Sequence, residues 1–189
     1  MNVPAELIDV TDGTSLGDIY EPYFDRTQRH FSGHVNAPSK PDASGTAAGS
    51  EKGNFTYFSF PIFTCYFEGG AVAMLDIAEK LIKRALGDDP LVATSLPRAG
   101  RVTVRSQPGK NRDVVHLLHA TPALRGTTRG SNVQPIQDII DLHDVEVSVT
   151  ATGPVKSVAV VPSGESIDFT QTGDKVSFTV PVVTGHQMV

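Results

Sequence analysis

The sequence predicts an α+β fold, with a partial α/β segment over residues 1–88 and a small antiparallel β-sandwich or barrel over 89–189. Two observations indicate this. Between Ala71 and Leu86 the apolar residues recur at three-to-four spacing, which is typical of one face of an amphipathic helix. After Gly87 this spacing disappears, and short β-rich runs separated by turn residues take over.

The first segment centres on one strand and one helix. Asn54–Phe60 is rich in Phe, Tyr and Thr and predicts a buried strand, and Pro61–Gly70 predicts a turn region. The helix Ala71–Leu86 should end at Gly87 and be kept from resuming by Pro90. Such a pair is half of a βαβ unit, which needs parallel neighbours. Few stretches here could supply them, so we expect this segment to pack on the β domain or on another chain.

The residues before this strand give weaker signals. Ser15 or Glu21 could begin a helix that runs to about Phe31. Residues 35–53 hold Pro38, Pro41 and three glycines among small polar residues, so we expect a loop that buries no face and is weakly ordered over 42–52.

The second segment reads as seven or eight short strands, a spacing that favours a small sandwich or barrel. The strand at Asp113–His119 has apolar residues on both faces and should be central, whereas Val145–Thr150 alternates strictly. The other predicted strands are Leu91–Thr94, Gly100–Ser106, Val155–Val161, Ser166–Thr170, Lys175–Val180 and a last one that begins at His186, and Ile139–Leu142 leads into Val145–Thr150.

Composition restricts the classes of protein. A net charge of −5 argues against a general nucleic-acid surface, and no apolar run approaches the ~20 residues of a membrane span. The first ten residues lack a basic segment followed by an apolar one, so we expect a cytoplasmic protein without a membrane or nucleic-acid partner. The single cysteine, Cys65, excludes an internal disulfide, and its aromatic neighbours favour a small buried residue.

Several groups of residues were weighed as chemical sites. Two acids 5–10 Å apart could hydrolyse a glycosidic bond, but Asp25 and Glu68 stand beside aromatics, and Asp141 and Asp144 only bracket His143. Gly69-Gly70 before a helix could receive an anion, although close packing explains these glycines better.

Histidine pairs give no clear metal site either. His30 and His34 would share a helical face, but the glutamate of the metalloprotease motif is absent, so a solvated or locally hydrogen-bonded pair is favoured. His116 and His119 would lie on opposite faces of a strand and could not ligate one ion. The sequence therefore predicts no catalytic, cofactor-binding or metal-ligating residue and no cofactor. A small hydrolase that uses His30, His34 and Asp25 is a minor alternative.

Three groups of longer stretches carry a family resemblance. They are Pro22–Thr27, Arg29–Phe31 and His34–Pro38; Tyr57–Phe63 and Glu68–Ala71 with the helix that follows; and Val114–Pro122, Glu146–Val149, Val176–Pro181 and Gly185–Val189. The second group resembles the end of the trimerisation domain of β-galactosidase-like glycoside hydrolases, the first the loop and helix before it, and the third their small C-terminal β domain. In such enzymes the trimerisation domain is flavodoxin- or amidotransferase-like, and the catalytic barrel lies N-terminal to it. The matching positions include none that is catalytic in the family.

The resemblance implies a non-catalytic C-terminal portion of a glycoside hydrolase that serves subunit assembly and supports a barrel absent from these residues. We expect it to form a homo-oligomer through the apolar surface that a missing sheet would cover. A glycoside hydrolase catalytic domain or a carbohydrate is a possible further partner. The alternative function is a stand-alone carbohydrate-binding β module.

Overall fold

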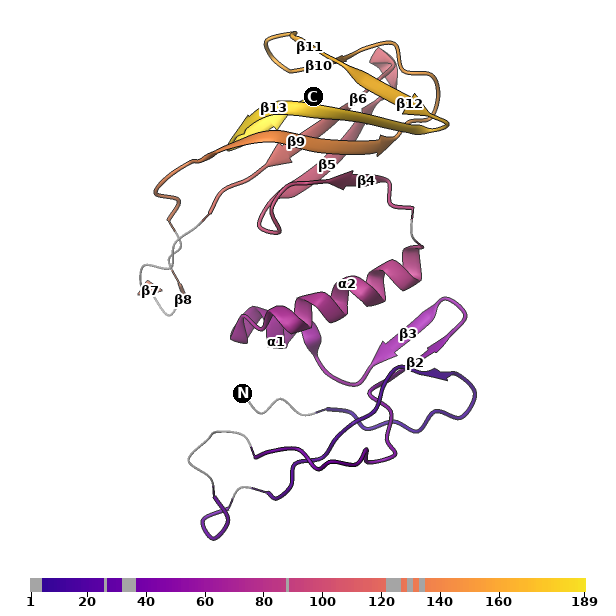
Figure 1. The fold of residues 1–189 in the computed structure, drawn as a ribbon, viewed down its shortest axis with the longest axis vertical. Coiled ribbons are helices and arrows are strands. Elements are labelled where there is room, and N and C mark those ends of the chain that lie inside the picture. Colours follow the sequence, from indigo (N-terminus) through magenta and orange to yellow (C-terminus); the bar gives the residue numbers. More distant parts are fainter. Residues whose placement is uncertain are drawn as a thin grey trace. The chain divides into compact units, whose positions relative to one another are not determined.

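This computed structural model describes residues 5–25, 27–31, 37–87, 89–121, 127–128, 131–132 and 135–189. The chain divides into two compact units, unit 1 over Met1–Asp89 and unit 2 over Pro90–Val189 (Figure 1). Within the described ranges, neither helix combines the length and the apolar character that crossing a membrane would need.

Unit 1 is built from a three-stranded antiparallel sheet and two helices. The strand order is β1-β2-β3. Only Gly53 and Asn54 join the last two strands, and Gly53 supplies the positive φ of 56° that suits such a tight hairpin. The elements are β1 (Thr14–Ser15), β2 (Gly49–Lys52), β3 (Phe55–Phe58), α1 (Ile62–Gly69) and α2 (Val72–Leu86).

The helix predicted to end at Phe31 is wrong. The described residues of that stretch are extended or bent, and they pair with residues far along the chain. The amide of Ile19 donates to the carbonyl of Thr46 at 3.0 Å, and the amide of Tyr23 donates to that of Pro38 at 2.7 Å. These long-range backbone bonds override the local helical spacing, which is only a weak preference by itself.

The prediction of a loop over residues 35–53 is also wrong, because β2 lies at its end. Ala47 and Ala48 are buried, and β2 follows them and pairs with strands on both sides. A Cβ at Gly49 would lie only 2.5 Å from the carbonyl oxygen of Tyr57, so the close approach of these two strands requires glycine. The small side chains that suggested a loop are the ones that allow this packing.

The central strand and helix of unit 1 occur near their predicted places. β3 lies within the predicted strand, and α2 ends as expected at Gly87, whose amide donates to the carbonyl of Lys83. Pro61–Gly70, however, is mostly the helix α1 rather than a turn region. In the described part of unit 1, β3 pairs antiparallel and Phe55 is 67% exposed, so the expected buried strand in a parallel, flavodoxin-like sheet is not observed.

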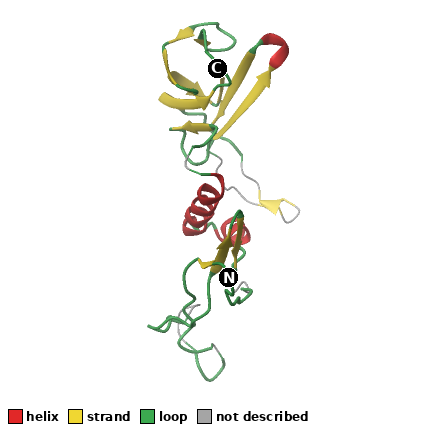
Figure 2. Cartoon of the chain, turned by 90° about the vertical axis from the view of Figure 1, so that its right-hand side faces the viewer, coloured by secondary structure: helices red, strands yellow, loops and turns green. Residues whose placement is uncertain are grey.

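Unit 2 is a sandwich of two antiparallel sheets, in the orders β12-β13-β9-β4 and β14-β6-β5, with two further small hairpins (Figure 2). Its described strands do not close into a barrel, so the sandwich is the one of the two predicted forms that occurs. The elements are β4 (Val92–Thr94), β5 (Arg101–Gln107), the short 3₁₀ helix η1 (Pro108–Lys110), β6 (Arg112–Leu118), β7 (Thr127–Thr128), β8 (Ser131–Asn132), β9 (Asp141–Thr150), β10 (Val158–Ala159), β11 (Ser166–Ile167), β12 (Phe169–Thr172), β13 (Lys175–Thr184) and β14 (His186–Met188).

The core of unit 2 lies between these two sheets. β6 is the middle strand of its sheet, as predicted, and contributes Val115 and the fully buried Leu117. The strict alternation predicted for Val145–Thr150 is confirmed, because the valines of that part of β9 face inward and Glu146 faces out. The remaining core residues include Val145, Val147, Val149, Ile167, Val176, Phe178, Val180 and Val183.

The strand pairing between β9 and β13 is interrupted at one position, which we call the step. Val180 pairs with Val145 and Val182 with His143, so Pro181 faces Asp144 between them. Asp144 has a positive φ of 52°, and proline has no N–H to donate. The two long strands therefore pair as two stretches on either side of this step.

Candidate interaction surface

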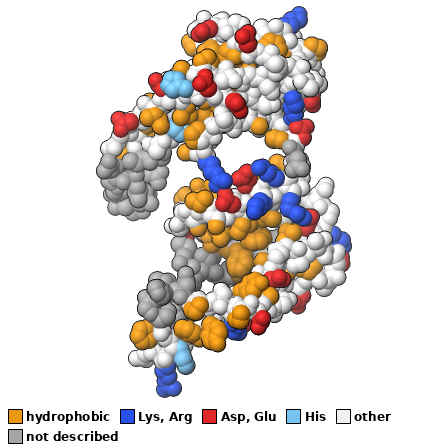
Figure 3. Space-filling view, in the orientation of Figure 1, with side chains coloured by type: hydrophobic (Ala, Val, Ile, Leu, Met, Phe, Trp, Pro, Cys, Tyr) orange, Lys and Arg blue, Asp and Glu red, His pale blue; other side chains and the backbone are white. Residues whose placement is uncertain are grey.

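In unit 1, several large apolar side chains of the two helices are exposed, whereas few apolar side chains are buried. Among its described apolar residues only Ala47, Ala48, Ile62 and Ala78 are buried. Figure 3 shows hydrophobic side chains gathered over the helical part of unit 1. The residues that we call the apolar helix surface are Phe63, Tyr66 and Phe67 of α1 and Val72, Ile82 and Leu86 of α2, with Phe67 88% and Leu86 78% exposed.

This exposure follows from how the two helices are seated. α1 ends at Gly70, which adopts the left-handed conformation with φ 64° and donates its amide to the carbonyl of Tyr66. α2 starts two residues later and packs against α1, but Ala78 is its one buried residue. The helix is thus buried only at a small side chain, and its larger apolar residues are half-buried or exposed. Surfaces of this kind mark interaction sites in proteins.

An ion pair fixes α2 to the sheet of unit 1. Arg84 donates from Nε and from an Nη atom to the two carboxylate oxygens of Glu51, each at 2.8 Å. The hydrogen bond from Arg84 lowers the pKa of Glu51 below its ordinary value of 4.5. A second pair, Lys83 to Glu79 at 2.7 Å, lies along the helix surface. Two-pronged arginine–carboxylate contacts fix geometry as well as charge, so this pair gives α2 a directional contact with β2.

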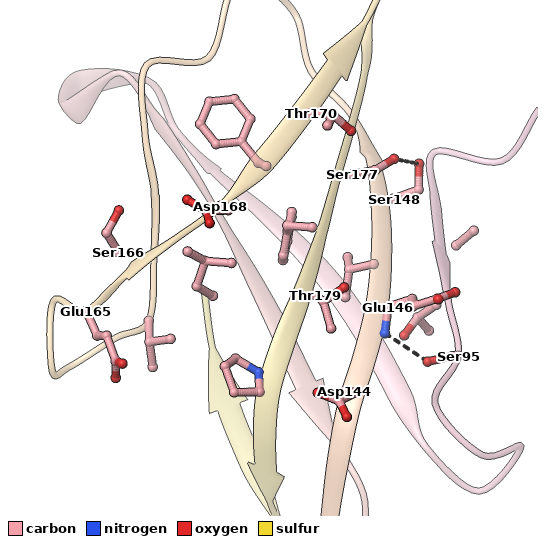
Figure 4. A pocket seen from close by; sticks show the side chains of 18 residues that line it. Ser95, Asp144, Glu146, Ser148, Glu165, Ser166, Asp168, Thr170, Ser177 and Thr179 are labelled. Atoms are coloured by element: carbon pink, nitrogen blue, oxygen red, sulfur yellow. Dashed lines mark hydrogen bonds between the residues drawn. The ribbon is translucent and has the colours of Figure 1, made fainter.

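Unit 2 carries an open groove of about 960 Å³ along β9 and β13, bordered by the β11–β12 segment (Figure 4). Its carboxylates come from both sides: Asp144 and Glu146 from β9, and Glu165 and Asp168 from or beside the bordering segment. None of the residues that line it is Lys or Arg. We call it the acidic groove. Its hydroxyl groups belong to Thr94, Ser95, Ser148, Ser166, Thr170, Ser177 and Thr179.

The acidic groove offers little to a sugar ring. Its two aromatic lining residues are Phe169, which is half-buried, and Phe178, which is buried in the core. Neither presents an open ring face of the kind on which sugars stack. The Ser177 hydroxyl is bonded to that of Ser148 at 3.3 Å. The carbohydrate-binding alternative therefore stays a prediction.

The acids weighed as catalytic candidates do not come together as one pair. Asp25 and Glu68 are exposed in unit 1. Asp141 accepts a hydrogen bond from the hydroxyl of Thr184 at 2.5 Å. Asp144 lines the acidic groove, whose other three carboxylates sequence reasoning missed. Only the strand pairing, which the sequence does not show, brings that set together.

The first histidine pair falls partly outside the described residues. His34 lies in that gap, so the proposed His30–His34 pair has no described geometry. His30 is exposed, and its backbone amide donates to the hydroxyl of Thr27 at 3.1 Å. Within the described residues, no group of three or more potential metal ligands gathers.

In the second histidine pair, His116 lies in β6 and His119 directly follows the end of that strand. His119 is only 4% exposed, and its Nδ1 has no hydrogen-bond partner within the described structure. His116 Nδ1 lies 3.1 Å from His186 Nε2. The two ring planes differ by 6° and the centroids lie 5.4 Å apart, which fits rings that meet edge to edge through a shared N–H better than rings stacked face to face. The pairing of β6 with β14 creates this contact.

Comparison with solved structures gives an informative match. No family model matches the chain, and no curated protein matches it. Among solved structures, α-L-fucosidase isoenzyme 2 from Paenibacillus thiaminolyticus superimposes with a TM-score of 0.86 at 34% sequence identity. The match covers 95% of this chain and 27% of that one. The chain is similar to one part of a glycoside hydrolase.

This match supports the predicted relationship at a coarser level. Because the neighbour is a fucosidase, the glycoside hydrolase relationship is supported, whereas the β-galactosidase-like assignment and the trimerisation domain are not confirmed. The chain spans about a quarter of the neighbour's length, so it corresponds to a portion of such an enzyme.

Proposed function

We propose that this chain serves as a non-catalytic C-terminal portion of a glycoside hydrolase and assembles with a second copy of itself through the apolar helix surface. The observation that carries the proposal is the contrast within unit 1, where six large apolar side chains of two helices are exposed while four mostly small ones are buried. The similarity to 27% of a fucosidase chain supports the glycoside hydrolase setting.

Burial energy favours such an assembly. Each large apolar side chain gains roughly 1.5–3 kcal/mol when it is fully covered. A stable interface buries about 1,200–2,000 Å² in total, with aromatic residues enriched at its centre. Phe63, Tyr66 and Phe67 supply such a centre, and Leu86 extends it along α2.

Sedimentation velocity of the full chain over a dilution series tests the assembly. We expect a reversible oligomer, and Phe67→Asp should weaken it about tenfold or more, because it removes one buried aromatic and adds a charge. Phe31→Asp is the matched control, since Phe31 is 74% exposed but lies outside the two helices. A strict monomer, or equal effects of the two variants, would contradict the proposal.

An activity assay tests the non-catalytic part of the proposal. The chain should leave a nitrophenyl α-L-fucoside intact at all concentrations used for sedimentation. Hydrolysis that persists through purification, and that is lost on Asp144→Asn or Glu146→Gln, would identify the acidic groove as a catalytic site and overturn this part.

A further inference from the structure

A second and separate surface of the chain is the β5–η1–β6 hairpin of unit 2. Residues 101–118 hold four basic residues and one acid, Asp113. Figure 2 shows the two strands running together to the short helix at their tip. We call this element the basic hairpin; its basic residues are Arg101, Arg105, Lys110 and Arg112.

The charges of the basic hairpin are not used within the described structure. The side chains of Arg101, Arg105 and Lys110 are exposed and make no hydrogen bond or ion pair with any described residue. Arg112 donates only to the side-chain oxygen of Gln107, at 2.7 Å. Arg101 and Arg105 share the outer face of β5, because Val102 and Val104 between them turn toward the core. The hairpin therefore presents three cationic side chains without a described partner, and two of them share one face of β5.

The acidic groove has the opposite character. Its four carboxylates, Asp144, Glu146, Glu165 and Asp168, accept no side-chain hydrogen bond and form no ion pair with described residues. Unit 2 is nearly balanced overall, with nine basic and eight acidic residues over 90–189. Four of these nine basic residues lie in the basic hairpin and four of these eight acids line the acidic groove, so about half of the charged residues of unit 2 are separated by sign between two places.

The sandwich keeps these two places apart in one copy. The basic hairpin belongs to the three-stranded sheet, and the groove runs along β9 and β13 of the four-stranded sheet. The buried core lies between the sheets, with Leu117 of β6 facing the valines of β9. A hairpin cannot fill the groove of its own sandwich without unfolding it.

We propose that the basic hairpin of one copy docks into the acidic groove of a second copy. The groove is open, and its volume of about 960 Å³ is at the upper end for pockets that enclose drug-sized molecules, so it has room for two long basic side chains from the hairpin tip. Opposite charges steer such an encounter and fix its register. Because the two surfaces differ, the contact is head to tail and leads to rings or open chains of copies.

Two double variants and a mixing experiment test this docking in the full chain. The hairpin variant is Arg105→Glu with Lys110→Glu, and the groove variant is Glu146→Lys with Glu165→Lys. Each should weaken salt-sensitive self-association about tenfold or more. Mixed together with Phe67→Asp added to both, so that the apolar helix contact is removed, they should form only one-to-one pairs, since each then keeps one working surface. Lys156→Glu, at an exposed residue outside both surfaces, is the charge control.

Sedimentation velocity at about 0.05 M and about 0.5 M salt separates this contact from the apolar one. The hairpin–groove contact should weaken at high salt and be unaffected by Phe67→Asp, whereas the apolar helix contact should persist at high salt and be lost in that variant. Self-association without a salt-sensitive part, or one that both double variants leave intact, would overturn the docking proposal. Failure of the mixed variants to pair would overturn its head-to-tail geometry.

Discussion

Glu51 lies in β2, within the residues 35–53 that the sequence predicts to be a loop. Its carboxylate receives both hydrogen bonds from Arg84 and so joins the sheet of unit 1 to α2. No pattern in the sequence connects these two positions, which are 33 residues apart. Individual contacts of this kind depend on tertiary packing, and this one became visible only in the structure.

Acidification should remove the contribution of this pair. Because Arg84 lowers the pKa of Glu51 in the folded chain, the pair stabilises unit 1 above the ordinary carboxyl value of 4.5. That stability is lost as pH falls through the lower folded value. Urea unfolding followed at pH 7 and below pH 4.5 should therefore show a smaller pH dependence in Glu51→Gln than in the wild type.

The control for this measurement is Asp42→Asn, because Asp42 is exposed and makes no described side-chain contact. It should keep the pH dependence of the wild type. An identical pH dependence in Glu51→Gln and the wild type would show that the Arg84 contact does not stabilise the fold.

At the scale of elements, the β2–β3 hairpin depends on the absence of a side chain at Gly49. A Cβ there would lie 2.5 Å from Tyr57 O and 2.9 Å from a ring carbon of Phe58. We expect Gly49→Ala to cost roughly 1–3 kcal/mol of unfolding free energy, because the strands must separate to admit it. Gly69→Ala in α1 meets no atom within 4 Å and should be neutral or stabilising by up to about 1 kcal/mol. Chemical denaturation of both variants provides the comparison.

β6 allows an internal test of the sandwich, since adjacent leucines face opposite ways. Leu117 is fully buried and Leu118 is 44% exposed. Leu117→Ala should lower the unfolding free energy of unit 2 by about 2–5 kcal/mol, the usual cost of a core cavity. Leu118→Ala should cost much less. Similar losses in the two variants would mean that the inward face of β6 has been assigned wrongly.

Elements in which apolar residues recur at a regular spacing could be predicted from the sequence. Elements that depend on hydrogen bonds to residues far along the chain could not. The alternation of β9 and the amphipathic spacing of α2 each reflect one buried face, so the sequence carries them locally. α1 follows Pro61 without a capping side chain, and therefore offers no start signal. The stretch before Phe31 has helical spacing, but its backbone bonds to residues between Pro38 and Gly49 instead.

At the scale of the molecule, the resemblance predicted more than the composition did. It led to a glycoside hydrolase, which the match to the fucosidase supports. The acidic groove was not predictable, because Asp144 and Glu165 are brought to one place only by the strand pairing. The apolar helix surface was predictable in part, since the sequence offers few strands that could cover the apolar face of α2.

The step at Asp144 and Pro181 has a consequence for how solvent deuterium enters unit 2. On one side of it lie the six pairs from Lys175–Thr150 to Val180–Val145, whose valines fill the core; on the other lie three pairs near Thr184. Local opening can start at the break, where proline offers no amide, and spread into the shorter stretch. Mass spectrometry after exchange should find residues 141–143 labelled well before 145–149, although the two belong to one continuous strand.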